Sequence, residues 1–295
     1  MFRGVSTAII TPFTRDYEID YDSLERFIDF QLKYVDAIVV LGTTGEASTI
    51  DDYEREKIVS LVVEKVNKKI PVIVGTGSNN PKIVIKNNKL AEKNNADGLL
   101  IVTPYYNKAT QNGLYDYFSF VSQNTILPII LYNVPSRTSV NMIPETATKL
   151  FQDNENIIGI KEASGDISQI AQLLSYKSSN MKVYSGNDDQ TLPLMSLGGD
   201  GVISVAANVI PKIMKELTES IFQNNYEKAR VINEKYNEFM RKMFIEINPI
   251  TVKYAVSKLS YCENVLRMPL TEISQSSKLI IDEMFERVEM AWNMD

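Results

Sequence analysis

The sequence predicts a (β/α)8 barrel followed by a helical C-terminal extension. Two observations predict this fold. Eight short apolar runs, rich in β-branched residues, recur along the first two thirds of the 295 residues, and longer amphipathic segments separate them. Because these runs do not alternate apolar with polar residues, we expect strands buried on both faces, as in a parallel sheet covered by helices.

The eight predicted strands follow one another at intervals of 32, 34, 27, 30, 29, 25 and 19 residues. They are VSTAII at 5–10, AIVVL at 37–41, PVIVG at 71–75, GLLIVT at 98–103, PIILY at 128–132, IIGIK at 157–161, KVYSG at 182–186 and GVISV at 201–205. A doubly wound sheet is the alternative, but it seldom contains eight evenly spaced parallel strands, and no GxGxxG follows the first run. The barrel, a fold that usually takes roughly 250 residues, is therefore the predicted architecture.

Helix signals lie between the runs. The first predicted helix covers 22–34 and carries its apolar residues on one face. The next covers 51–66 and has acidic residues in its first turn, where they interact favourably with the helix dipole. A third opens at Asn80-Pro81, since proline is well tolerated at the first position of a helix.

The strand pattern stops near Pro211, and only helical patterns follow. One helical stripe contains Ala229, Ile232, Tyr236, Phe239, Met240 and Met243. A second long helix is predicted over 274–293. We assign residues 1–223 to the barrel and residues 224–295 to a helical extension that packs on it, with an oligomer surface as the alternative for the stripe.

The composition limits the classes of function. With 31 Lys and Arg against 37 Asp and Glu, the net charge is −6, which argues against nucleic acid or an anionic membrane as a partner. No apolar stretch approaches the ~20 residues that span a bilayer. Cys262 is the only cysteine, so no intrachain disulfide is possible, and we expect a cytoplasmic protein.

The sequence contains no histidine, and this excludes several chemistries. With no histidine and one cysteine, the usual zinc sites cannot be assembled, and we expect no metal. Hydrolases with a Ser-His-Asp or Cys-His arrangement are excluded because their base is missing. Acid–base chemistry must therefore use lysine, tyrosine, threonine or carboxylate groups.

Lys161 is the first candidate for chemistry, because it ends the sixth predicted strand and active sites of such barrels form at the C-terminal strand ends. Partial desolvation there lowers the pKa of an ammonium group. The resulting neutral amine attacks carbonyl groups and forms a Schiff base. A strand-end lysine that reaches solvent or pairs with a carboxylate is the alternative interpretation.

Hydroxyl groups gather at the ends of neighbouring predicted strands, at Thr43, Thr44, Tyr106 and Tyr132. Tyr132 ends the fifth strand, next to the sixth, so we expect its phenol near Lys161. A Schiff-base enzyme must move protons, and without histidine a Tyr–Thr relay is a reasonable substitute. Tyrosines that only make local hydrogen bonds at the barrel rim are the alternative.

Two glycine-containing turns differ in their position relative to the strands. GTTGE at 42–46 follows a strand and precedes a helix, so its backbone N–H groups suit a small anion such as a carboxylate. GGDG at 198–201 precedes the eighth strand, at the opposite end of the barrel, and is interpreted as a turn. The sequence therefore gives little support for a phosphosugar enzyme.

Several longer motifs, in this order, resemble the dihydrodipicolinate synthase family of pyruvate-dependent class I aldolases and lyases. The resemblance covers essentially the whole chain. The motifs are TAIITPF at 7–13, GTTGEAST at 42–49, GTGSNN at 75–80, TPYYNKATQNGLYDYF at 103–118, LYNVPSRT at 131–138, GIKEASGD at 159–166, SGNDD at 185–189, GVISVAANV at 201–209, INPITVKYA at 247–255 and LRMPLTEIS at 266–274.

The resemblance implies a role for each catalytic candidate. Lys161 would form a Schiff base with pyruvate, with no cofactor besides this covalent adduct. Tyr132 would donate and accept protons, linked through the hydroxyl of Thr43 to Tyr106. In the family a neighbouring subunit supplies that second tyrosine, which implies a homo-oligomer, with a tetramer of two dimers favoured over a dimer.

The resemblance also implies the substrate contacts and the reaction. Thr44 would hold the pyruvate carboxylate, and the backbone at Gly186 and Ile203 would line the same pocket. Arg137 aligns with the arginine that grips the carboxylate of L-aspartate semialdehyde, since a guanidinium matches a carboxylate bidentately. The implied reaction is condensation of pyruvate with this aldehyde, followed by ring closure, on the route to diaminopimelate and lysine.

Two alternative functions remain besides this reaction. The first is another pyruvate lyase, such as an N-acetylneuraminate lyase or a 2-keto-3-deoxy sugar acid aldolase, whose members generally lack the pair Arg137-Thr138. The second, from a different class, is a catalytically silent barrel that senses a metabolite or serves a structural role. The silent barrel is argued against by the joint presence of Lys161, Tyr132, Thr43 and Tyr106.

The sequence departs from the family at the site where lysine inhibits some members. Asn79 and Tyr105 match that site, whereas Asp52 and Arg55 stand at the histidine positions and Ile83 replaces an acid. Because an apolar side chain cannot pair with the ammonium group of the effector, we predict weak or absent inhibition by lysine. Half-inhibition of pyruvate consumption at sub-millimolar lysine would contradict this prediction.

Overall fold

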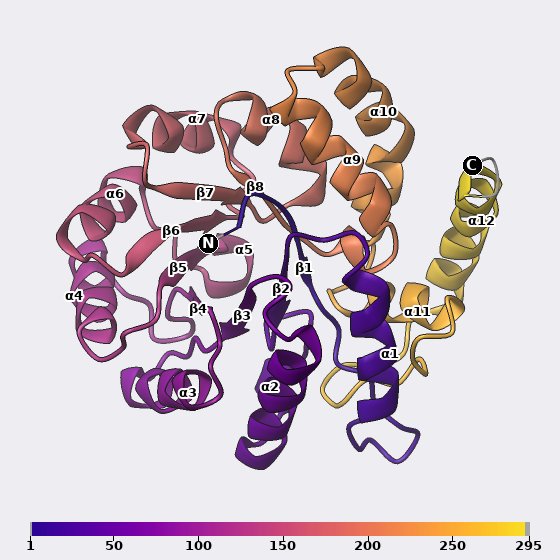
Figure 1. Ribbon diagram of the computed structural model, residues 1–295, viewed down its shortest axis with the longest axis horizontal. Coiled ribbons are helices and arrows are strands. Elements are labelled where there is room, and N and C mark those ends of the chain that lie inside the picture. Colours follow the sequence, from indigo (N-terminus) through magenta and orange to yellow (C-terminus); the bar gives the residue numbers. More distant parts are fainter. Residues whose placement is uncertain (1, 293–295) are drawn as a thin grey trace.

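The computed structural model describes residues 2–292, with side chains up to residue 286, and its eight strands form a closed parallel barrel (Figure 1). Each strand pairs in parallel with the next, and β1 pairs with β8 to close the sheet. The strands are β1 Gly4–Ala8, β2 Ala37–Val40, β3 Val72–Gly75, β4 Gly98–Val102, β5 Ile129–Asn133, β6 Ile157–Glu162, β7 Lys182–Ser185 and β8 Gly201–Ser204.

All eight predicted strands are confirmed, with small differences at their ends. The first run was expected to continue to Ile10, but β1 ends at Ala8. At that point the Ile10 N–H donates to the side chain of Asn208, 3.1 Å away, instead of to a neighbouring strand. A side chain that replaces a backbone partner therefore ends the strand while the chain stays buried.

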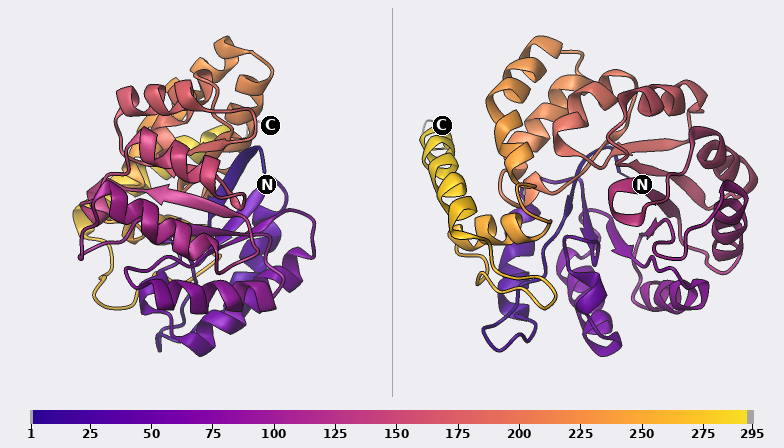
Figure 2. Two further views of the ribbon diagram at one scale, coloured as in Figure 1. Left: turned by 90° about the vertical axis from the view of Figure 1, so that its left-hand side faces the viewer. Right: turned by 180° about the vertical axis from the view of Figure 1, so that it is seen from behind.

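Helices surround the barrel on its outer face (Figures 1 and 2). Those within the first 222 residues are α1 Tyr21–Gln31, α2 Asp52–Val66, α3 Pro81–Lys93, α4 Gln111–Ser122, α5 Pro135–Thr138, α6 Pro144–Asp153, α7 Ile167–Tyr176, α8 Thr191–Ser196 and α9 Pro211–Phe222. The predicted start at Asn80-Pro81 is confirmed, since Asn80 caps α3 by accepting from the Lys82 N–H. Asp51 caps α2 reciprocally with Glu54, so this helix begins one residue later than predicted.

The core has two layers. Between strands and helices lies a large apolar cluster, and a smaller one fills the inside of the barrel. Phe2 stacks on Tyr184 at 4.3 Å between ring centres and accepts the Tyr184 hydroxyl proton on its carbonyl oxygen, 2.8 Å away. This pair fills the barrel from the N-terminal side of the strands, so the open end is the one where the strands finish.

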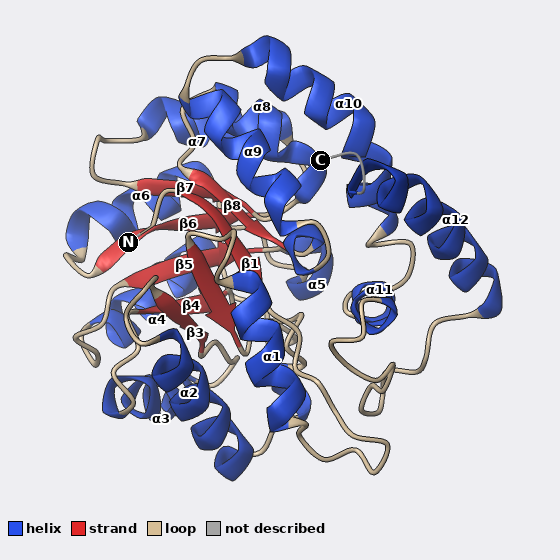
Figure 3. Cartoon of the chain, turned by 45° about the vertical axis from the view of Figure 1, so that its right-hand side comes forward, coloured by secondary structure: helices blue, strands red, loops and turns tan. Residues whose placement is uncertain are grey.

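The C-terminal region consists of α10 Tyr226–Lys242, α11 Ile250–Lys258 and α12 Gln275–Trp292. α10 packs against α8 and α9, and its apolar stripe is buried in the core shared with the barrel helices. α11 lies beside α12 (Figure 3), and it also packs against the short helical turn 206–208 that follows β8. Residue 293, the end of the predicted last helix, lies outside the described residues. None of the described helices is long and apolar enough to cross a bilayer.

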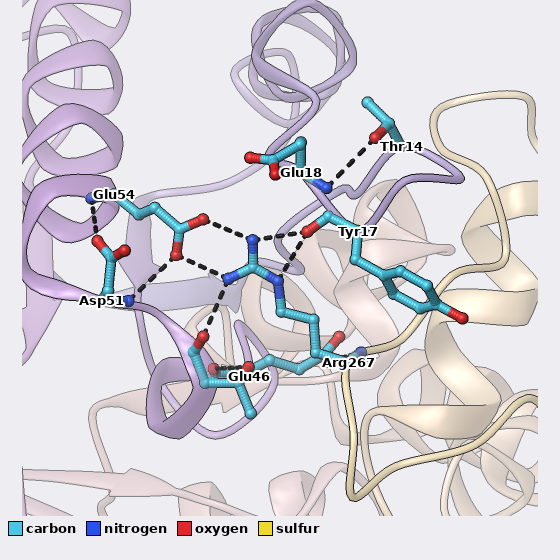
Figure 4. A network of polar contacts seen from close by, with 8 residues as sticks. Thr14, Tyr17, Glu18, Glu46, Asp51, Glu54 and Arg267 are labelled. Carbon is cyan, nitrogen blue, oxygen red and sulfur yellow. Dashed lines mark hydrogen bonds and ion pairs between the residues drawn. The ribbon is translucent and has the colours of Figure 1, made fainter.

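A buried ion pair joins this extension to the barrel. Lys253 on α11 binds Glu46, in the loop after β2, and both side chains are almost fully buried. The Glu46 carboxylate also accepts a hydrogen bond from the backbone N–H of Arg267, at 3.1 Å. The Arg267 guanidinium in turn donates to both carboxylate oxygens of Glu54, at 2.5 and 2.7 Å, so the segment before α12 is tied to α2 (Figure 4).

Removal of one partner of the buried pair should destabilise the fold strongly. Lys253→Met leaves the Glu46 carboxylate buried without its counter-charge, and we expect the free energy of unfolding to fall by about 3–5 kcal/mol. Urea denaturation of the purified protein measures this change. The double variant Glu46→Gln/Lys253→Met should regain much of the loss.

The matched control is Lys258→Met on the same helix. Lys258 pairs with Asp282 at 2.6 Å, but both side chains are about one third exposed, so this change should cost less than ~1 kcal/mol. An equal fall in the free energy of unfolding for the two single variants would show that burial of the Lys253 pair does not increase its contribution to stability.

Candidate functional site

A cavity of about 150 Å³ lies at the C-terminal ends of the strands. Six of the eight site residues predicted from the sequence line it, namely Thr43, Thr44, Tyr132, Arg137, Lys161 and Gly186. They come from the loop after β2, the end of β5, α5, the end of β6 and the segment after β7. Because the parallel strands of the barrel all end on the same side, residues that are up to 143 positions apart in the sequence lie together there.

Strand pairing places Tyr132 beside Lys161. The two are direct partners in the parallel register of β5 and β6, and the Lys161 Nζ lies 4.5 Å from the centre of the Tyr132 ring. The next residues, Asn133 and Glu162, are also paired, and the Asn133 amide donates to both Glu162 carboxylate oxygens at 3.1–3.2 Å. Because successive side chains alternate between faces, one pair points into the barrel while the other links the two strands outside it.

Burial shifts the ionisation of Lys161. Its side chain is 5% exposed, and desolvation lowers the pKa of Lys161 to about 8. Two charges act with smaller effect, since Asp188 favours the ammonium form and Arg137 opposes it. The Asp188 carboxylate is itself held by the backbone N–H groups of Val205 and Ala206, at 3.0 and 2.9 Å. The amine is therefore far easier to deprotonate than an exposed lysine.

Tyr132 remains a phenol in the same environment. Its pKa is raised by burial, against smaller opposing effects of Arg137 and of a hydrogen bond with Thr43. A neutral phenol next to a partly neutral amine can both donate and accept a proton. The loop that carries Thr43 is fixed to the segment after β1 by the Thr11 hydroxyl, which donates to the Gly45 carbonyl oxygen at 2.7 Å.

Gly186 is required by its close approach to Lys161. A Cβ atom at position 186 would lie 3.1 Å from Lys161 Cε and 2.6 Å from the Cβ of Ala163. Any larger residue would therefore displace the lysine side chain or its neighbour. The glycine contributes by leaving room for the amine.

The structure does not bring two predicted residues to this cavity. Tyr106, in the loop after β4, is 93% exposed with a φ of 71°, and it does not line the cavity of its own chain. Ile203 is fully buried in the apolar cluster inside the barrel, and it does not line the cavity either.

Sequence reasoning missed two groups of residues. Phe244 and Asn248, between α10 and α11, line the cavity from the extension, and Asp188 acts on the charge of Lys161. The motif INPITVKYA contains Asn248, but a rule based on strand ends cannot reach a segment that follows the last strand. Within the described residues, no group of three or more Asp, Glu or Cys side chains is arranged to hold a metal ion.

A second cavity of about 520 Å³ adjoins the first and shares Thr43 and Tyr132 with it. Its lining includes Asp52, Arg55 and Ile83, which stand at the family's effector positions, together with Tyr105. Four of the five residues compared with the family's lysine site therefore line one cavity, whereas Asn79 is not among its lining residues. Weak or absent inhibition by lysine stays a prediction.

Fold and site together define a class of protein: a (β/α)8 barrel with a buried lysine amine, whose pKa is about 8, in a cavity at the end of the barrel where the strands finish. The model of the dihydrodipicolinate synthetase family matches residues 1–287. The chain therefore belongs to the dihydrodipicolinate synthetase family.

Individual relatives are similar over nearly their full length. A 4-hydroxy-tetrahydrodipicolinate synthase of Thermotoga neapolitana is 52% identical over 281 residues, which cover 94% of this chain and 95% of the relative. The crystal structure of dihydrodipicolinate synthase from Thermotoga maritima is 48% identical with a TM-score of 0.96, covering 97% and 98% of the two chains. A dihydrodipicolinate synthase from Acinetobacter baumannii, crystallised with pyruvate, is 37% identical with a TM-score of 0.95, covering 97% and 98%.

The lowered pKa of Lys161 is directly measurable. In competitive labelling with acetic anhydride, only neutral amines react, so the rate at Lys161 should rise with a midpoint near pH 8. A lysine in an added unstructured peptide serves as the internal reference, with an ordinary pKa of about 10.4. Peptide mass spectrometry reads both rates, and a Lys161 midpoint equal to the reference would contradict the effect of burial.

The Asp188→Asn variant tests whether the Asp188 carboxylate raises the pKa of Lys161. It removes the negative charge that favours the ammonium form, so the Lys161 midpoint should move to lower pH. An asparagine oxygen can still accept from the Val205 and Ala206 N–H groups. A midpoint that rises in this variant would show that Asp188 does not stabilise the charged amine.

Proposed function

We propose that this chain catalyses the reaction of a 4-hydroxy-tetrahydrodipicolinate synthase, the condensation of pyruvate with L-aspartate 4-semialdehyde on the route to diaminopimelate and lysine. The observation that carries the proposal is Lys161, a buried amine with a pKa near 8 in contact with Tyr132. The cavity is smaller than the ~300–1,000 Å³ of sites for drug-sized ligands, which suits a small keto acid. The proposal requires no cofactor apart from the covalent adduct on Lys161.

The first half of the reaction makes a carbon nucleophile from pyruvate. The neutral amine of Lys161 adds to the keto carbon, and the carbinolamine loses water to leave a protonated imine. Tyr132 supplies and removes the protons for these steps, with Thr43 hydrogen-bonded to it. The positive imine nitrogen then draws electrons from the methyl group, which loses a proton and gives the enamine.

The second half joins the two substrates and frees the enzyme. The enamine carbon bonds to the aldehyde carbon of the semialdehyde, whose oxygen takes a proton and becomes the hydroxyl group. The amine of the same substrate then attacks the imine carbon, closes the ring and expels the amine of Lys161. Atoms balance with water as the other product of the overall condensation.

Two carboxylates must be held during these steps. The loop 42–46, with the buried Thr44, lies at the cavity and suits the pyruvate carboxylate. Arg137, on the exposed rim of the same cavity, suits the carboxylate of the semialdehyde. The two sites would therefore place the keto acid deep in the cavity and the aldehyde closer to solvent.

Consumption of L-aspartate semialdehyde with pyruvate tests this function, run beside N-acetylmannosamine and glyceraldehyde. We expect fast turnover with the semialdehyde alone. Arg137→Ala should lower kcat/KM for the semialdehyde by about 10- to 100-fold, because a hydrogen bond to a charged group is lost, while pyruvate still forms its adduct. Preference for a sugar aldehyde would contradict the substrate assignment, and a lack of any reaction would favour the silent barrel.

We also propose that the chain works as a homo-oligomer, with a tetramer favoured over a dimer. The support is Tyr106, which is exposed at the tip of its loop and in a backbone conformation uncommon for a non-glycine residue. Such an aromatic side chain suits insertion into a neighbouring subunit, where it would approach Tyr132 through Thr43. With Cys262 as its only cysteine, the chain suits the reducing cytoplasm, where we expect the enzyme.

Complementation between two inactive variants tests this contribution across subunits. Tyr106→Phe keeps Lys161, and Lys161→Met keeps Tyr106, so a hybrid contains one complete site only if Tyr106 acts in the partner. Co-expression of the two variants should therefore restore activity above that of either alone. A mixture that stays as inactive as its parents, although hybrids form, would place Tyr106 outside the relay. Sedimentation analysis then gives the number of subunits.

A further inference from the structure

Asn248 connects the groups proposed to hold the two carboxylates. It lies between α10 and α11, is 6% exposed and lines the cavity around Lys161. Its side-chain amide donates to the Thr44 hydroxyl at 3.0 Å, and its backbone carbonyl oxygen accepts from the Arg137 guanidinium at 3.1 Å. A residue of the extension is therefore placed between the inner and the outer carboxylate sites.

The Asn248 side chain also has an unused hydrogen-bond acceptor. Its Oδ1 is buried and has no partner. A buried acceptor without a partner is destabilising, so such atoms are rare unless a ligand or water supplies the missing donor. Among the described residues with an unpartnered buried side-chain atom, Asn248 alone lines this cavity.

We propose that Asn248 Oδ1 accepts a hydrogen bond from the α-ammonium group of L-aspartate semialdehyde while Arg137 holds the carboxylate on the same carbon. This inference rests on the proposed function and makes Asn248 a specificity-determining residue for the aldehyde. An ammonium and a carboxylate on one carbon require binding groups that are neighbours. The contact between Arg137 and the Asn248 backbone supplies that arrangement.

A neutral amide suits this position better than a carboxylate. No aspartate or glutamate is found among the described residues that line the cavity, so an ammonium group there needs a neutral acceptor, and the unpartnered Oδ1 of Asn248 is one. A carboxylate beside the ammonium would favour its charged form strongly, whereas an amide oxygen does so less. The substrate amine must lose its proton before it closes the ring, and an amide acceptor leaves that step easier.

The bond to Thr44 keeps the acceptor available. Because Nδ2 donates to the Thr44 hydroxyl, the amide cannot turn freely, and Oδ1 stays on the other side of the group. The same bond ties the acceptor to the loop that suits the pyruvate carboxylate. The position of the second substrate would thereby be set relative to the first.

The experiment compares two ligands that differ only in the amino group. Succinate semialdehyde has the aldehyde and the carboxylate of L-aspartate semialdehyde but lacks the amine. Asn248→Ala should raise KM for L-aspartate semialdehyde roughly 10- to 100-fold, while the inhibition constant of succinate semialdehyde changes less than about threefold. The Arg137 contact uses the backbone of Asn248, so the alanine variant retains it.

Equal factors for the two ligands would overturn the inference, because they would mean that Asn248 only positions the carboxylate site. Unchanged constants for both ligands would overturn it as well. The circular dichroism spectrum and the urea midpoint of the variant, compared with those of the wild type, show whether it is folded.

Two further variants test the direction of the proposed hydrogen bond and provide a control. Asn248→Asp keeps an acceptor and removes the donor, so it should bind L-aspartate semialdehyde better than the alanine variant does. Poorer binding than the alanine variant would mean that the free group is a donor, and would overturn the inference. Ile247→Ala is the matched control in the same segment, since this neighbour is 64% exposed and both constants should stay within about twofold of the wild type.

Different results would overturn the proposed function and the role of Asn248. A wild-type protein that forms a pyruvate adduct but does not consume L-aspartate semialdehyde would overturn the proposed function together with this inference. A wild-type protein that consumes it, with an alanine variant that weakens both ligands equally, would overturn the role of Asn248 alone.

Discussion

The register between β5 and β6 is the constraint on which the site depends. It pairs Tyr132 with Lys161, and a slip of β6 by one residue would turn Lys161 to the outside of the barrel. The pairing shifts once near Ile129, at the start of the two strands, and is regular from there to the cavity. Asn133 and Glu162, hydrogen-bonded on the opposite face, oppose any further slip.

Closure of the sheet explains why Lys161 is desolvated. Because β1 pairs with β8, the barrel interior is sealed from the side, and Phe2 with Tyr184 fills it from the N-terminal side. A lysine at the remaining end is desolvated without losing access to a small ligand. The protein thus holds an amine that is costly to charge, and buried groups of this kind are usual where function competes with stability.

The extension supplies what a bare barrel lacks. The loop after β2 carries the two threonines of the site, and its Glu46 is bound by Lys253 and Arg267 from the extension. Asn248, on the segment that leads into α11, reaches the cavity itself. The C-terminal helices are therefore part of the site's construction, through one buried ion pair and one amide.

Much of this arrangement could be predicted from the sequence, because its signals are local. Continuous apolar runs gave the eight strands, and a lysine that ends such a run, as Lys161 does, is chemically conspicuous. α5, which carries Arg137, is only four residues long and has no periodicity to detect. Asn248 was missed because its role arises from a contact with Thr44, 204 residues away. The exposure of Tyr106 likewise follows from loop geometry that no pattern reveals.

The most direct test of the account is to identify the residue that pyruvate modifies. The protein is incubated with pyruvate, reduced with borohydride, digested and mapped by mass spectrometry. We expect one reduced adduct per chain, on Lys161, in preference to the many exposed lysines. Absence of an adduct, or its spread over surface lysines with Lys161 unmodified, would contradict the central claim that the buried amine is the nucleophile.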